Sequence, residues 1–385
     1  MDLIYLDYNA TTPVDPAVVA RMTPFFDRHY GNPSSKGHAY GWAAAEAVEV
    51  AREELAELIG ADPERITFTS GSTESLNTVI KGVVDPSSRG KRHIVTTIAE
   101  HSAVVESCRS LERDGVRVTY LPVDANGLVS REDIENAMSE DTVLVAVMWA
   151  NNEIGSIHPI EEIARAVRER DILFLTDATQ AVGKVPVSVD SVDLLTCSAH
   201  KFYGPKGVGA LWTRPGVRVR PLLHGGSQED GLRSGTLNVP GIVGIGAAAS
   251  VARNRLEVDA ARHRIQRDRL ENELQSAIEG LRVNASGEDR LPQTSSLTFP
   301  GVRAANLLTE LRGLALSAGS ACASGSGKPS RVLKAIGLSD SDALATIRFS
   351  LGRFTTDEQL DTAITMVVEA YRKVQAAAPS PVAQQ

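Results

Sequence analysis

Two residues that can do cofactor chemistry follow apolar, strand-like stretches of this 385-residue chain. Asp177 comes directly after residues 172–176, and Lys201 lies three residues after Ser198, the last residue of 193–198. A lysine amine forms a Schiff base with the aldehyde of pyridoxal phosphate, and a carboxylate keeps the pyridine nitrogen protonated, so that the ring accepts electrons. An aspartate and a lysine at neighbouring strand ends therefore indicate pyridoxal phosphate chemistry.

Asp177 and Lys201 each have a competing interpretation. A carboxylate after an apolar run is costly to bury unless it is paired, and a metal ion or a structural arginine would pair it as well as a pyridinium N–H. No set of histidines and carboxylates with metal-ligand spacing surrounds Asp177, so we favour the pyridinium and expect no metal. Gln180, three residues on, could reach the phenolic oxygen of the ring. Lys206 is the other candidate for the imine, but its proline and glycine neighbours are typical of a turn.

Hydroxyl groups and a glycine occur where a strand would give way to a helix, in residues 69–75. The first N–H groups of a helix have no partner within the helix and attract anions. The hydroxyls of Ser72 and Thr73 add donors, so a cofactor phosphate fits here, and Ser198 and His200 could donate to the same phosphate. An ordinary helix cap, with glutamate three residues on, is the competing explanation for this segment.

Imidazole and amide side chains follow two further strand-like runs. His101 comes after residues 93–97 and could stack on a flat cofactor ring and move protons, although a lone histidine is more often a surface or capping residue. Asn151 and Asn152 follow residues 143–149, where ligands bind in open α/β folds, and one of them could hydrogen-bond the phenolic oxygen. An Asx-turn would explain the pair as well.

The three cysteines differ in their surroundings. Cys322 lies in residues 317–327, which are too rich in glycine and serine to form a core element, so its thiol would be accessible and able to move. Cys197 lies within a strand-like run and Cys108 within a helical one, which is typical of buried structural thiols. A cofactor site together with one thiol on a mobile loop indicates sulfur transfer.

Arg348 stands between apolar residues in the run 347–350. Arginine binds carboxylates through two parallel hydrogen bonds, so Arg348 could hold the α-carboxylate of an amino acid, and Arg233 is a second basic candidate. A structural salt bridge would explain Arg348 equally well.

Composition and charge exclude several classes of protein. The formal net charge is −8 and no long basic run occurs, so nucleic acid is not expected as a direct ligand. No stretch approaches the length of a membrane span, and the acidic N-terminus lacks the basic leader of a signal peptide. Three cysteines cannot build a disulfide framework in a chain of this size, which predicts a protein of the reducing cytoplasm.

Short β-branched runs alternate with amphipathic helical patterns along most of the chain. This alternation predicts an α/β domain in which a mainly parallel, seven-stranded sheet lies between helices. The candidate strands are residues 66–70, 93–97, 116–123, 143–149, 172–177, 193–198 and 209–213.

The pattern changes after about residue 250. We expect residues 16–250 to form the large cofactor-binding domain, and residues 1–15 with 251–375 to form a smaller α+β domain that carries Cys322. The composition of residues 376–385, rich in alanine, proline and glutamine, predicts a disordered tail. The elements expected in the smaller domain are a long, charged helix at 252–281, strands at 295–299 and 347–350, and a helix at 304–312.

Together these motifs resemble those of the cysteine desulfurases of the NifS/IscS type, DndA-type members included. That family belongs to the class V aminotransferase superfamily of fold-type I pyridoxal phosphate enzymes. The resemblance covers more than nine tenths of the chain, and the motifs occur in the order of the family. The matching segments are residues 5–13, 31–35, 69–75, 151–155, 177–180, 200–207, 233–236, 319–322 and 348–353.

The resemblance implies a role for each candidate residue. Lys201 forms the imine, and Cys322 takes the sulfur atom of L-cysteine as a persulfide while L-alanine is released. Arg348 and Asn152 contact the substrate. The implied cofactor contacts are Asp177 at the pyridine nitrogen, His101 on the ring face, Asn152 and Gln180 at the ring oxygen, Ser72, Thr73, Ser198 and His200 at the phosphate, and Thr236 at the phosphate bound by the other subunit of a homodimer.

The acceptor of the sulfur stays open, because the residues after Cys322 are richer in glycine than in relatives and the C-terminal tail is short. An iron–sulfur scaffold, a tRNA-thiolation protein and a DNA-phosphorothioation protein are the three candidates. The alternative function is another class V enzyme, such as an aminotransferase or a selenocysteine lyase, that does not need Cys322. A non-enzymatic scaffold is the third reading, but it would have no need of Lys201, Asp177 and His101.

Overall fold

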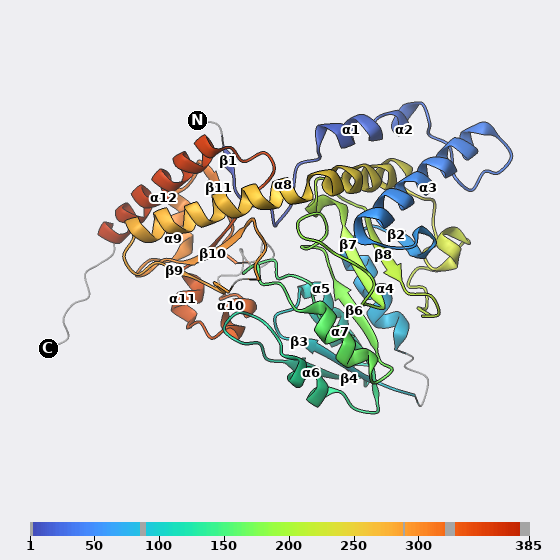
Figure 1. Cartoon of the computed structure of the whole chain (residues 1–385), viewed down its shortest axis with the longest axis horizontal. Coiled ribbons are helices and arrows are strands. Elements are labelled where there is room, and N and C mark those ends of the chain that lie inside the picture. Colours follow the sequence, from blue (N-terminus) through green and yellow to red (C-terminus); the bar gives the residue numbers. More distant parts are fainter. Residues whose placement is uncertain (1–2, 85–89, 288, 320–327, 378–385) are drawn as a thin grey trace.

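The computed structural model describes residues 3–84, 90–287, 289–319 and 328–377. In Figure 1 a large part with a central sheet lies next to a smaller part, and one long helix runs across both. The central sheet has the strand order β2-β8-β7-β6-β5-β3-β4. Its neighbouring strands are parallel except where β8 pairs with β2 and β7. The expectation of a mainly parallel seven-stranded sheet is therefore confirmed.

Each candidate strand of the central sheet is present, although several end a few residues earlier than expected. Because β3, β5, β6 and β7 are parallel, the polar residues that follow them arrive at the same edge of the sheet. The observed strands are β2 (Ile66–Thr69), β3 (His93–Thr97), β4 (Arg117–Leu121), β5 (Thr142–Ala146), β6 (Leu173–Asp177), β7 (Leu194–Ser198) and β8 (Gly209–Thr213).

Helices cover both faces of the central sheet, which explains why its inner strands are apolar at successive positions. On one face, Phe68 and Phe174 pack in a core shared with α3 (Ala39–Ile59), α6 (Arg131–Ala137) and α7 (Ile160–Arg168). On the other face, the core includes α4 (Ser72–Val83), α5 (Ser102–Glu112) and the strand residues Ile94 and Leu175.

The long helix α8 (Val239–Ala277) begins thirteen residues before the helix expected from residue 252. Its first third consists of small and apolar residues that are buried on nearly all sides, so that no amphipathic pattern marks it in the sequence. Asn238 caps it by accepting from Gly241 N, and Pro240 occupies the first turn. The expected boundary at residue 250 falls inside this helix, and the division into domains stays a prediction.

The smaller part has its own sheet and core, to the left in Figure 1. The antiparallel sheet has the order β12-β10-β9, and β1 pairs with β11 in a second, parallel sheet. The N-terminal segment thus lies with residues from the far end of the chain. The elements are β1 (Ile4–Tyr5), β9 (Arg282–Val283), β10 (Thr294–Thr298), α9 (Ala304–Glu310), β11 (Leu314–Ala315), α10 (Arg331–Ala335), α11 (Asp340–Leu344), β12 (Thr346–Ser350) and α12 (Asp357–Ala377).

Short helices complete the described chain: α1 (Pro16–Met22), α2 (Pro24–Asp27) and the 3₁₀ turns η1 (Pro63–Arg65), η2 (Ala199–Lys201) and η3 (Gln228–Gly231). The first two residues of the expected tail, 376 and 377, belong to α12, and the rest of that tail lies outside the described residues. Within the described ranges, no helix combines the length and apolar character that crossing a lipid bilayer requires.

Candidate active site

A cavity of about 260 Å³ lies where β3, β5, β6 and β7 end. Asn9 and Ala10 of the N-terminal segment form another part of its wall. Ten residues that the sequence singled out meet in this cavity: Ser72, Thr73, His101, Asn152, Asp177, Gln180, Ser198, His200, Lys201 and Arg348.

Lys201 is held inside the cavity by backbone carbonyl groups. Its Nζ donates to Asn9 O at 2.7 Å and to Ala10 O at 2.8 Å. The N-terminal segment is fixed there because Thr12 N donates to His200 O at 2.9 Å. Lys206, the other imine candidate, is exposed and does not line the cavity.

Asp177 is a buried carboxylate at the end of β6. Its Oδ1 accepts from Thr179 N at 3.1 Å and from Thr196 Oγ1 at 3.4 Å. Within the described part of the chain, no arginine or lysine forms an ion pair with it, and no group of residues there could hold a metal ion. The negative charge of Asp177 is thus directed at the cavity.

His101 both caps α5 and lines the cavity. Its Nδ1 accepts from Ala103 N at 3.2 Å, so the proton of the neutral ring lies on Nε2. Burial lowers the pKa of His101, Asp177 raises it, and Lys201 lowers it further, with a net downward shift. The ring is therefore a neutral imidazole whose Nε2–H remains for a ligand. The capping interpretation is confirmed, and the predicted contact of His101 with a cofactor ring stays a prediction.

Hydroxyl groups cluster at the N-terminus of α4. Ser72 N donates to Ser198 Oγ at 2.8 Å, and Ser72 Oγ lies 2.7 Å from Ser198 Oγ and 2.5 Å from Thr179 Oγ1. A Cβ atom on Gly209 would come within 2.6 Å of Gly71 Cα, so the two glycines let the strand and the helix start approach closely. The result is a polar cup at a positive helix end.

His200 lies beside this cup, where Nδ1 is 3.0 Å from Thr11 Oγ1. Burial, with help from Lys201, Lys206 and Lys184, lowers the pKa of His200 to about 4. The ring is therefore neutral at physiological pH and can act as a hydrogen-bond donor without adding charge.

Arg348 of β12 is buried and paired, as the salt-bridge interpretation required, and it also lines the cavity. Its Nη2 donates to Asp7 Oδ1 at 2.6 Å and its Nη1 to Asn152 O at 2.8 Å. Arg348 Nε has no hydrogen-bond partner among the described residues. Nη1 and Nη2 each keep a second N–H group, so the guanidinium can still bind an anion.

The two neighbouring asparagines have different surroundings. Asn151 is fully buried and forms the Asx-turn: its Oδ1 accepts from Glu153 N at 2.8 Å and Ile154 N at 3.1 Å. Asn152 lines the cavity. The Asx-turn interpretation thus holds for Asn151, and only Asn152 of the pair is placed to meet a ligand.

Two sequence candidates among the described residues, Thr236 and Arg233, do not line this cavity. Thr236 is exposed and lies outside it. Arg233 pairs instead with Glu74 of α4, with Nε and Oε1 2.9 Å apart. Cys322 lies outside the described residues.

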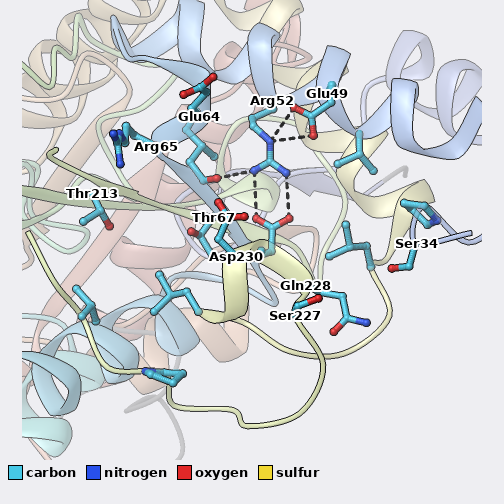
Figure 2. A pocket seen from close by; sticks show the side chains of 18 of the residues that line it. Ser34, Glu49, Arg52, Glu64, Arg65, Thr67, Thr213, Ser227, Gln228 and Asp230 are labelled. Carbon is cyan, nitrogen blue, oxygen red and sulfur yellow. Dashed lines mark hydrogen bonds and ion pairs between the residues drawn. The ribbon is translucent and has the colours of Figure 1, made fainter. Parts of the chain in front are cut away.

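The segment that carries Arg233 and Thr236 is also fixed to α3. Arg52 Nη2 donates to Glu229 Oε1 at 3.0 Å, and Phe68 N donates to the same carboxylate at 2.7 Å. Figure 2 shows Arg52 with Glu49 beside it, in the wall of a second and larger pocket near residues 227–230. The loop that holds Thr236 is therefore anchored at two points.

Sequence reasoning missed several residues of the cavity wall. Asn9 and Ala10 lie in a matched motif, but they reach the cavity only because β1 and Asp7 pair with segments from the far end of the chain. Nothing local in the sequence indicates that contact. Thr179, in contrast, lies between Asp177 and Gln180, and its position could have suggested a third polar group at this strand end.

The two cysteines within the described residues are buried. Burial raises the pKa of Cys108 and of Cys197 to about 12. Neither thiol lines the cavity, so both have the structural character that their sequence positions predict.

Comparisons with known proteins place this geometry in a family. Residues 4–362 match the model of the family described as "Aminotransferase class-V". The cysteine desulfurase IscS of Rickettsia prowazekii (strain Madrid E) is 45% identical over 380 residues, which are 98% of this chain and 93% of the relative. The chain belongs to the aminotransferase class-V family. Within it, the chain groups with the cysteine desulfurases of the NifS/IscS type, which confirms the enzyme class predicted from its motifs.

Solved structures agree. One titled "NIFS-LIKE PROTEIN" is 40% identical, has a TM-score of 0.90 and aligns over 96% of this chain and all (100%) of that one. Another, titled "SspA in complex with cysteine", is 38% identical with a TM-score of 0.81 over 92% of this chain and 100% of that one. The fold prediction is confirmed at the level of the whole chain.

Proposed function

We propose that this cysteine desulfurase holds pyridoxal phosphate in the cavity at Lys201, removes the sulfur atom of L-cysteine and passes it to Cys322. The convergence of three features in one cavity carries the proposal. These are the Lys201 amine, the Asp177 carboxylate without a cation partner among the described residues, and the polar cup at the start of α4. No single one of them would be specific.

The residues present fit the parts of the cofactor. The cup formed by Ser72, Ser198 and Thr179 at a helix N-terminus, with Thr73 also in the cavity wall, suits a phosphate. Asp177 suits a protonated pyridine nitrogen, because it accepts hydrogen bonds from the protein at Oδ1 and keeps a charge toward the cavity. The neutral His101 ring suits a flat aromatic partner.

When bound, pyridoxal phosphate supplies an electron sink for bond cleavage at the substrate. The protein supplies binding and proton movement. Lys201 Nζ, released from the Asn9 and Ala10 carbonyls, is the amine that can take and return a proton at the substrate Cα. His101 Nε2–H is the second group that can exchange a proton there, and its low pKa keeps it neutral for this task.

Arg348 and Asn152 are the proposed substrate contacts. The Arg348 guanidinium has five N–H groups, of which Nη1 and Nη2 each use one for Asn152 O and Asp7 Oδ1. The second N–H groups of Nη1 and Nη2 can bind the α-carboxylate of L-cysteine. Asp7 holds the guanidinium in place and partly neutralises its positive charge.

Cys322 is the proposed nucleophile. Its thiolate attacks the sulfur atom of the substrate, the S–C bond breaks with its electron pair going to the substrate carbon, and that carbon gains a proton to give L-alanine. The product on the enzyme is a Cys322 persulfide. The described residues on either side of the Cys322 segment support this proposal, because Gly319 and Ser330 both lie against Glu153, which directly follows the cavity residue Asn152.

A homodimer is the proposed assembly. Phe26, Tyr30, Tyr40 and Trp42 are 53–67% exposed, and the Tyr30 and Tyr40 rings lie 5.4 Å apart, so exposed aromatic residues gather around α2 and the start of α3. Such a patch is typical of a protein interface. The exposed Thr236 would reach the phosphate of the second subunit across this interface.

The sulfur acceptor is a protein, and the three candidates remain an iron–sulfur scaffold, a tRNA-thiolation protein and a DNA-phosphorothioation protein. We place the reaction in the cytoplasm, since Cys108 and Cys197 are free thiols, as is usual for cysteines in a reducing compartment.

The proposal is tested by incubating wild type, Cys322→Ser and Lys201→Ala with L-cysteine and measuring alanine and protein-bound persulfide. Both products are expected from the wild type, and both are expected to be lost in each variant. The visible absorption of bound cofactor should be present in the wild type and in Cys322→Ser.

One result would clearly contradict the assignment of Cys322 as the nucleophile. If Cys322→Ser formed alanine as fast as the wild type, the chemistry would not use this thiol, and a thiol-independent class V reaction would replace the proposal. Cys108→Ala, which removes a buried thiol, is the matched control and should keep persulfide formation.

A further inference from the structure

Lys184 lies close to the cavity but has no part in the reaction as proposed. It follows Gln180 by one tight turn, in which Lys184 N donates to Ala181 O at 3.0 Å. Gly183 has φ +74°, and a Cβ atom there would come within 2.7 Å of Phe202 Cβ, so this position requires glycine. The turn returns the Lys184 side chain to that of Gln180.

A chain of hydrogen bonds runs from Lys184 to the lysine of the cavity. Lys184 Nζ donates to Gln180 Oε1 at 2.5 Å, and Gln180 Nε2 donates to Asn9 O at 2.9 Å. Lys201 Nζ donates to the same Asn9 oxygen at 2.7 Å. Because a carbonyl oxygen can only accept, the amide nitrogen of Gln180 must face Asn9, and its oxygen must face Lys184.

Donation from Lys184 has two consequences for Gln180. It fixes the rotation of the carboxamide, since an exchanged amide would place a donor against Lys184 and an acceptor against Asn9 O. It also polarises the amide, so that the Gln180 N–H groups become stronger donors. One N–H binds Asn9, and because Gln180 lines the cavity, the other can meet an acceptor atom on a ligand.

Lys184 has polar surroundings on its other side. It lines a small cavity of about 20 Å³, which has room for about one water. Gln293 Oε1 and His263 Nε2 also belong to this region, and neither has a hydrogen-bond partner among the described residues. Burial above all, and then Lys201 and Arg348, lower the pKa of Lys184 well below its usual value. Lys184 carries N–H donors in either protonation state, so its bond to Gln180 does not depend on its charge.

We propose that Lys184 is a positioning residue, which holds the Gln180 carboxamide so that its N–H groups face Asn9 O and the phenolic oxygen of bound pyridoxal phosphate. The inference rests on the proposed function, since it requires the cofactor in the cavity. A donor at the phenolic oxygen favours the deprotonated form of that oxygen. Lys184 therefore acts on the cofactor through Gln180 and not by contact. The charged and titratable groups that line the two cavities beside Gln180 and Lys184 are Asp177, His101, Lys201, His200, Arg348, Asp259, His263, Tyr8 and Tyr203.

The test uses the full-length protein freed of cofactor and titrated with pyridoxal phosphate. Two quantities are measured: the dissociation constant, and the pH midpoint at which the absorption band of the bound cofactor changes. Lys184→Met is expected to raise the dissociation constant about three- to tenfold. It should also move the pH midpoint upward, because losing the donated hydrogen bond favours the protonated form of the cofactor.

Conservative variants separate positioning from general support of the fold. Lys184→Arg and Lys184→Gln keep N–H donors and should stay near the wild type in both measurements. Lys206→Met removes a nearby lysine that does not line the cavity and should change neither. In the Gln180→Ala background, Lys184→Met should add no further shift, since residues that act through one another are not additive.

Either of two results would overturn the inference. One is a Lys184→Met protein with wild-type affinity and pH midpoint. The other is a Lys184→Met effect of full size in the Gln180→Ala background. A wild-type protein that does not bind pyridoxal phosphate at all would overturn the proposed function first, and the inference with it.

Discussion

The cavity has two walls that are built in different ways. The first consists of residues that follow the strands of the central sheet, such as Asp177, Ser198 and Lys201. The second consists of Asn9 and Arg348, which come together only because segments 341 residues apart meet in the Asp7–Arg348 pair. In the proposed function, cofactor chemistry depends mainly on the first wall and binding of the substrate carboxylate on Arg348 of the second. Substitutions in the two walls should therefore have different kinetic signatures.

The largest expected effect is that of Lys201→Ala, in the first wall. Loss of the amine that is proposed to form the imine with the cofactor and to move the substrate proton should lower kcat by about a thousandfold or more. Alanine formation is the measurement, with Lys206→Ala as the matched control, which should keep wild-type kcat. A Lys201→Ala enzyme with substantial kcat and an inactive Lys206→Ala enzyme would reverse the assignment of the two lysines.

A smaller and different effect is expected from Arg348→Met, in the second wall. Loss of the donors for the substrate carboxylate should raise KM for L-cysteine about 10- to 100-fold, and cofactor absorption should stay unchanged. Arg348→Lys keeps the positive charge but loses the planar pair of donors, so its KM should lie between those of the wild type and Arg348→Met.

Equal losses of cofactor binding in Arg348→Met and Asp177→Asn would show that the two walls do not act separately. Because Arg348 also pairs with Asp7, the melting temperature of each variant must be measured beside KM. A KM effect that disappears once unfolded protein is accounted for would contradict the role in substrate binding.

The smallest expected effect is on stability, and it concerns a buried histidine outside the two walls. His158 is 3% exposed, and burial lowers its pKa from 6.5 to about 4. Between these two values the unfolded chain binds more protons than the folded chain, so the free energy of unfolding falls as the pH falls. At pH 5 the loss from this residue amounts to about 2 kcal/mol.

His158→Phe removes this titration and should make the free energy of unfolding less sensitive to acid over the same range. Denaturant unfolding at neutral pH and at pH near 5 gives the comparison. Glu100 has the opposite sign: burial raises its pKa to about 8, so its contribution weakens as the pH rises toward that value. An unchanged acid sensitivity in His158→Phe would show that His158 is protonated in the folded protein.

The sequence singled out the residues of the first wall and Arg348 of the second but not Asn9, and the reason is geometric. Asp177, Ser198 and Lys201 follow apolar runs whose parallel arrangement brings them to one edge, so chain order alone places them together. Asn9 lies in a segment that no periodic pattern connects with β12 or η2. The sequence could not distinguish the roles of Asn151 and Asn152 either, since only the folded chain shows which of the two amides forms the turn.

The helix α8 sets how the two parts of the molecule can move. Its 39 residues span about 58 Å, and its buried side chains enter the core of the central sheet at Ile242 and Ala249 and the core of the smaller part at Leu270 and Leu274. A hinge between the parts would have to break backbone hydrogen bonds within this helix. The enzyme is therefore a stiff frame, in which the two walls of the cavity keep their separation and thermal unfolding of the described parts should be cooperative.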